Sequence, residues 1–201
     1  MSSRIGVYLE VGAKRVFASA ADWPGWCRSG KDEASALANL ASYAPRYSKV
    51  ARLARMEIPG EPAFTVIERV KGNATTDFGA PGVPTEAEFR PSTAKQRERH
   101  AIITEACWTY LDRVVARAPR GLRKGPRGGG RDRDKMYAHV LDAEVGYAPA
   151  IGLRLKAPDR KALSELFRDP IEDTKWPVTY AMRRIAWHAL DHAWEIEDRL
   201  P

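Results

Sequence analysis

Two histidines in the last part of the sequence have the spacing of metal ligands. His188 and His192 lie four residues apart in a segment, 178–199, whose apolar residues recur with helical periodicity. One turn of helix separates them, so both imidazoles can point at a single ion. Asp191 and Glu195 fall on the same helical face. No glutamate follows His188 directly, so the pattern differs from the zinc-protease motif.

A third ligand must come from another part of the chain. His139 is the best candidate because it lies in an apolar helical stretch, although a hydrogen-bonded core histidine is the alternative. His100 follows a heavily charged run and is expected to be exposed. Three neutral imidazoles would leave one coordination position open, where an ion can lower the pKa of a bound water or thiol. Zinc, nickel, iron and manganese all suit such a site.

Asp191 and Glu195 are candidate catalytic residues beside this site. Either carboxylate could orient a ligating histidine or act as a base for a bound water. The alternative is a salt bridge to Arg184 or to another basic residue.

The composition indicates a globular, basic protein. Of the 201 residues, 44% are hydrophobic and 29% are charged, which is enough for one medium domain or two small ones. The net charge is +7, and most of the excess lies between Arg113 and Lys135. We expect a cytoplasmic protein without a membrane partner, since no long apolar stretch and no signal peptide pattern is visible.

The basic stretch contains a glycine-rich loop, 119–130, with three alternative roles. Arg127, Arg131 and Arg133 could bind the carboxylates of a low-molecular-weight thiol or a substrate beside the metal. The loop could instead bind nucleic-acid phosphates, or it could be a solvated connector.

The two cysteines, Cys27 and Cys107, form no CxxC pair, so we expect no disulfide. Cys107 lies in an apolar helical stretch and should be a core residue, whereas Cys27 follows a turn and should be partly exposed.

Periodicity and turn residues predict an α+β fold. We expect strands over 4–11, 14–20 and 63–70, and two helical pieces between Ser29 and Met56 that are broken near Pro45. Glycines and prolines predict a linker over 71–92. Helices are expected over 94–118, 132–148, 159–167 and 178–199. The predicted architecture is a small N-terminal sheet-plus-helix unit (1–70), a linker (71–92) and a four-helix bundle (93–201).

The N-terminal segment resembles the small antitoxin-like HicB domain. Two short strands precede an Asp-x-Pro-Gly turn at 22–25, and a helix with the sequence Asp-Glu-Ala-Ser-Ala-Leu-Ala-Asn-Leu follows at 32–40. The resemblance covers about residues 4–50. It implies a small sheet backed by a helix that often binds a partner protein; the alternative is a module that packs on the rest of the chain.

Residues 94–201 resemble the DinB-like metal-binding helical bundle superfamily. The similarity rests on residues 137–144 and 184–192, which carry one histidine and then two histidines four residues apart. It implies that His139, His188 and His192 bind a divalent metal. It also implies chemistry like that of the mycothiol- or bacillithiol-dependent isomerases and S-transferases, in which a metal-bound thiolate attacks an electrophile.

Two functions therefore stay open at the level of sequence. The first is a metal-dependent enzyme acting on a small-molecule thiol or an electrophilic substrate. The second is a non-catalytic binding module with a structural or vestigial metal, which would engage protein or nucleic acid through the HicB-like unit and the basic loop. A homodimer is a further partner to test.

Overall fold

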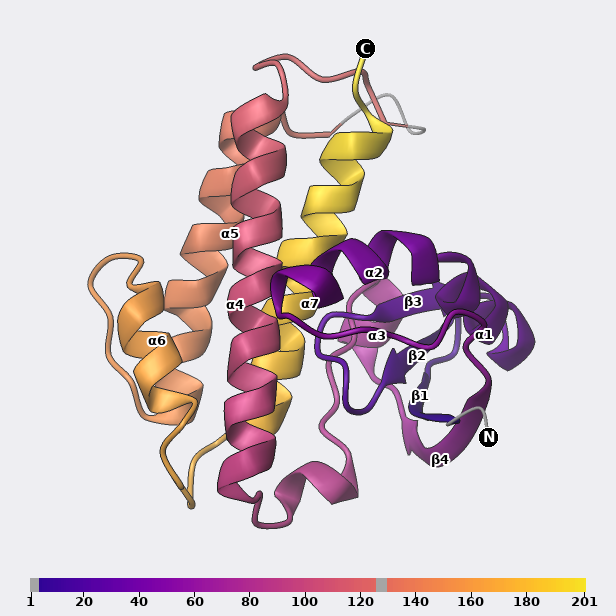
Figure 1. The fold of residues 1–201 in the computed structure, drawn as a ribbon, viewed down its shortest axis with the longest axis vertical. Coiled ribbons are helices and arrows are strands. Elements are labelled where there is room, and N and C mark those ends of the chain that lie inside the picture. The colour runs from indigo at the N-terminus through magenta and orange to yellow at the C-terminus, as the bar shows by residue number, and fades with distance from the viewer. Residues whose placement is uncertain (1–3, 126–129) are drawn as a thin grey trace.

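A computed structural model describes residues 4–125 and 130–201 and shows a mixed α+β fold (Figure 1). The strands are β1 (Ile5–Val11), β2 (Val16–Ala20), β3 (Cys27–Gly30) and β4 (Phe64–Lys71). The helices are α1 (Glu33–Ser42), α2 (Ala44–Leu53), α3 (Ala74–Phe78), α4 (Ala94–Arg117), α5 (Arg133–Tyr147), α6 (Arg160–Leu166) and α7 (Val178–Asp198), with 3₁₀ turns η1 (Glu86–Phe89) and η2 (Ala148–Ile151).

The four strands form one mixed sheet in the order β3-β2-β1-β4. β1 pairs antiparallel with β2 and parallel with β4. Every residue of β2 is buried because both faces of the strand are covered. On one face Phe17 packs edge-on against Trp187 of α7, with 6.1 Å between ring centroids. Ala18 belongs to the main core that includes α1 and α2.

β3 is the strand that the sequence did not predict. Residues Ser29 to Glu33 were expected to open a helix, but α1 begins only at Glu33. Asp32 is its N-cap, and its carboxylate accepts a hydrogen bond of 2.8 Å from the main-chain N–H of Ser35. The short stretch before this cap pairs with β2 instead.

Three long helices, α4, α5 and α7, run side by side, and the sheet with α1 and α2 packs against one side of them (Figure 1). Along α7 all residues from Val178 to Leu190 are buried, since α4 and α5 pack on it and Phe17 of β2 covers Trp187. The expected four-helix bundle is not confirmed, because α6 has only seven residues. None of the described helices is long and apolar enough to cross a membrane.

The segment predicted as a linker, 71–92, contains α3 and η1 and is held against the sheet. Glu10 of β1 is buried, and its carboxylate accepts hydrogen bonds from the main-chain N–H groups of Gly82 and Val83, at 2.9 and 3.1 Å. In addition, residues of the sheet and of α4 and α7 pack together in one apolar core. The division into two units stays a prediction.

Candidate metal centre

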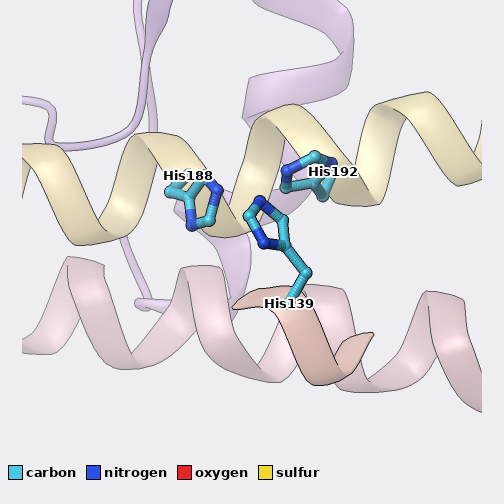
Figure 2. A group of neighbouring side chains, drawn as sticks. All are labelled: His139, His188 and His192. Carbon is cyan, nitrogen blue, oxygen red and sulfur yellow. The ribbon is translucent and has the colours of Figure 1, made fainter. Parts of the chain in front are cut away.

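The three histidines predicted as ligands meet between α5 and α7. Figure 2 shows His139 extending from one helix towards His188 and His192 on the other. One nitrogen from each ring lies within 4.8 Å of the others. A tetrahedral ion about 2.1 Å from each nitrogen needs separations of about 3.4 Å. Small side-chain rotations would therefore close the group around an ion.

The packing of α5 on α7 explains why His139 faces the pair. α5 begins after Asp132, whose carboxylate accepts a hydrogen bond from the main-chain N–H of Leu122 and does not cap the helix. One and two turns further on, Met136 and Val140 are buried against the core, before and after His139 in the sequence. These two residues fix the rotation of α5 and so direct the imidazole towards α7.

Burial favours the neutral form of His188 and of His139. His188 is 7% exposed, and desolvation, followed by the charges of His192 and His139, lowers its pKa to about 2. Desolvation, followed by the positive charge of Arg131, also lowers the pKa of His139. The Nδ1 atom of His188 is buried without a hydrogen-bond partner among the described residues. Neutral imidazole is the form that binds a metal, so the chemistry of these donors fits a divalent ion.

Of the two candidate carboxylates, only Glu195 contacts a histidine of this centre. The His192 Nδ1 atom lies 3.0 Å from a Glu195 oxygen, and this hydrogen bond is the main reason that the pKa of Glu195 is lowered. An ionised carboxylate can only accept, so the proton lies on Nδ1 and the Nε2 lone pair remains available to a metal. Asp191 instead pairs with Arg28 at 3.0 Å.

The described end of the basic loop lies near the centre. Arg131 is close enough to lower the pKa of both His139 and His188, and its main-chain carbonyl accepts a hydrogen bond from Arg199. Arg133 points elsewhere and donates to the carbonyl of Ala118. Arg127 lies outside the described residues. The loop thus contributes positive charge through Arg131, whereas Arg133 joins α4 to α5.

Two predictions about other reactive side chains were wrong. His100 was expected to be exposed but is 4% exposed, since it shares the buried face of α4 with Ile103, Cys107 and Leu111. Cys27 was expected to be partly exposed but is buried in β3, which raises the pKa of its thiol to about 12. The core position of Cys107 is confirmed.

Two residues that flank His188 were not among the predicted site residues. Tyr147, at the end of α5, lies with its ring centroid 6.2 Å from that of His188. Arg184 is buried one turn before His188 on α7, and its charge helps to lower the pKa of His188. The sequence predicts Arg184 only as a possible salt-bridge partner of Asp191 or Glu195, but these carboxylates pair with Arg28 and Arg199. The four-residue spacing of Arg184 and His188 was the signal that could have placed Arg184 beside the centre.

Comparison with known proteins assigns no activity. No protein-family model and no solved structure matches the chain. A UPF0502 protein of Cupriavidus metallidurans is 38% identical over 86 residues, which is 42% of this chain. The matched residues cover about a third of the length of that curated relative. The name of the relative states no substrate and no reaction.

Proposed function

We propose that this chain is a metal-dependent enzyme whose centre of three histidines activates a thiol or a water, as in the DinB-like superfamily. The observation that carries the proposal is the convergence of His139, His188 and His192, with one nitrogen from each ring within 4.8 Å of the others. Three histidines with similar spacing could occur by chance on a solvated surface. A group from two packed helices that includes the buried His188, whose Nδ1 atom has no hydrogen-bond partner among the described residues, is much harder to explain without a ligand.

The donor set favours an open site over a closed structural one. Among the described residues, no cysteine or carboxylate joins the three histidines as a fourth metal-binding group. Three protein ligands and a free position are typical of catalytic zinc sites, whereas structural sites have four. A bound divalent ion would supply Lewis-acid chemistry and lower the pKa of a water or thiol beside it.

The residues around the centre have roles that follow from their contacts. Glu195 orients His192 through the hydrogen bond to Nδ1, and Arg199 holds Glu195 at 2.9 Å. The positive charges of Arg131 and Arg184 favour a negatively charged group, such as a thiolate, over its neutral acid. Trp187 lies beside His188, with 6.0 Å between ring centroids, and is itself buried against Phe17 of β2.

The test is whether a small thiol changes the environment of the bound metal. Cobalt(II) in the full chain should show a change in its visible spectrum when 2-mercaptoethanol is added, because thiol sulfur would enter the open position. His139→Ala should weaken or remove this response, whereas Asp191→Asn should keep it. A cobalt spectrum that thiols and water analogues leave unchanged would instead support the non-catalytic binding module with a structural metal.

A further inference from the structure

Three arginines are strongly buried in the part of the chain that the structure describes, and one of them differs from the others. Arg183 and Arg199 are 5% and 6% exposed, and each contacts a carboxylate: Arg183 binds Glu88 at 2.7 Å and Arg199 binds Glu195 at 2.9 Å. Arg184 is 9% exposed, but no carboxylate among the described residues lies within 4 Å of its guanidinium. Buried charges are normally paired, because desolvation of an unpaired ion is costly.

The contacts of Arg184 are all with neutral groups. Its guanidinium donates to the carbonyl of Pro81 at 2.7 Å and, more weakly, to the Tyr147 hydroxyl at 3.4 Å. It also lies over the rings of Trp187 and Tyr147, at 4.8 and 5.6 Å. Cation–π contacts of this kind attract the guanidinium, but they do not neutralise its charge. The guanidinium is therefore held in place with an incomplete set of partners.

The position of Arg184 relates this charge to the metal centre. Four residues separate it from His188, which corresponds to about 6 Å along the helix axis. Tyr147 contacts Arg184 and also lies beside the His188 ring. Tyr147, His139 and His192 are only partly buried, so this side of the centre is not sealed by protein.

We infer that Arg184, with the Tyr147 hydroxyl, binds the carboxylate of a small molecule whose other end reaches the metal. This inference rests on the proposed function and adds the substrate class to it. A planar guanidinium matches a carboxylate through two parallel hydrogen bonds, and a phenol can donate a third. The carboxylate can belong either to the thiol or to the electrophile that reacts with it.

The experiment compares two thiols that differ in charge. Cobalt-loaded full chain is titrated with 3-mercaptopropionate and with 2-mercaptoethanol, and metal content is measured in parallel. We expect the carboxylated thiol to bind about tenfold more tightly, as one charge-assisted interaction predicts. Arg184→Gln should remove this preference without changing the metal content, and Arg184→Lys should keep part of it. Arg28→Gln is the matched control and should leave the preference intact, since Arg28 pairs with Asp191.

The outcomes separate this inference from the proposed function. If cobalt binds but the wild-type chain neither discriminates between the thiols nor binds propionate beside 2-mercaptoethanol, the carboxylate subsite is refuted and the metal proposal stands. This comparison needs no variant, so it remains decisive if Arg184→Gln fails to fold. Absence of bound cobalt would overturn both. Propionate that binds together with 2-mercaptoethanol, without any preference for 3-mercaptopropionate, would assign the carboxylate to the electrophile. A preference for 3-mercaptopropionate that propionate competes away would assign the carboxylate to the thiol.

Discussion

Removal of Glu195 should weaken metal binding without abolishing it. Its carboxylate accepts the hydrogen bond of His192 Nδ1 at 3.0 Å, which orients the ring and makes the other nitrogen a better donor. Loss of such an outer partner typically costs about 10- to 100-fold in metal affinity. The Glu195 side chain is 37% exposed, and its carboxylate also pairs with Arg199. We therefore expect the lower end of this range, a loss of metal affinity of about tenfold or 1.4 kcal/mol.

The assay is competition for zinc between the protein and a chromophoric chelator at fixed pH and ionic strength. Glu195→Ala should show the full loss, and Glu195→Gln should show less, since an amide oxygen still accepts the bond from Nδ1. Asp191→Asn is the control, because Asp191 lies on the same helix but pairs with Arg28. Equal zinc affinities for Glu195→Ala and Asp191→Asn would refute the role given to Glu195.

Three further predictions concern stability. Burial lowers the pKa of His100 to about 4, below the unfolded value of about 6.5, so the free energy of unfolding decreases as the pH falls from 6.5 towards 4. Between pH 7.5 and 5, wild type should lose about 2 kcal/mol more of this free energy than His100→Leu, measured by urea unfolding, and equal losses would contradict the prediction. Glu88→Gln leaves Arg183 buried without its carboxylate and should lower the free energy of unfolding by about 3–5 kcal/mol in the same assay. The double variant Glu88→Leu and Arg183→Met removes both charges and should recover most of this loss. Gly130 has φ +113°, and a Cβ atom there would lie 2.8 Å from the Arg199 guanidinium. Gly130→Ala should therefore lower the free energy of unfolding by about 1 kcal/mol or more, measured by thermal unfolding.

The sequence predicted the helices of the centre well because their periodicity is strong. The expected helices at 132–148 and 178–199 correspond to α5 and α7 within a residue or two. The histidine spacing predicted that His188 and His192 share a face, but only the packing of α5 on α7 brings His139 to them. Periodicity applied to α4 would also have predicted the burial of His100, since Ile103 and Cys107 mark the same face.

Other features depend on contacts between distant segments, which periodicity does not encode. Residues 71–92 look like a linker because they are rich in glycine and proline, yet Glu10 binds their main chain across the sheet. β3 forms because its main chain pairs with β2 at the edge of the sheet, and its four residues have no strong strand preference of their own. The unpaired state of Arg184 is equally invisible in sequence, since it depends on which carboxylates fold near it.

The most direct test of the central claim is elemental analysis of the purified full chain after incubation with zinc and removal of the unbound metal. Wild type should retain one divalent ion per chain, because His139, His188 and His192 supply three imidazole nitrogen donors. The double variant His188→Ala and His192→Ala should retain none while keeping its helical circular dichroism. Full zinc occupancy in the folded double variant, or none in wild type, would contradict the account.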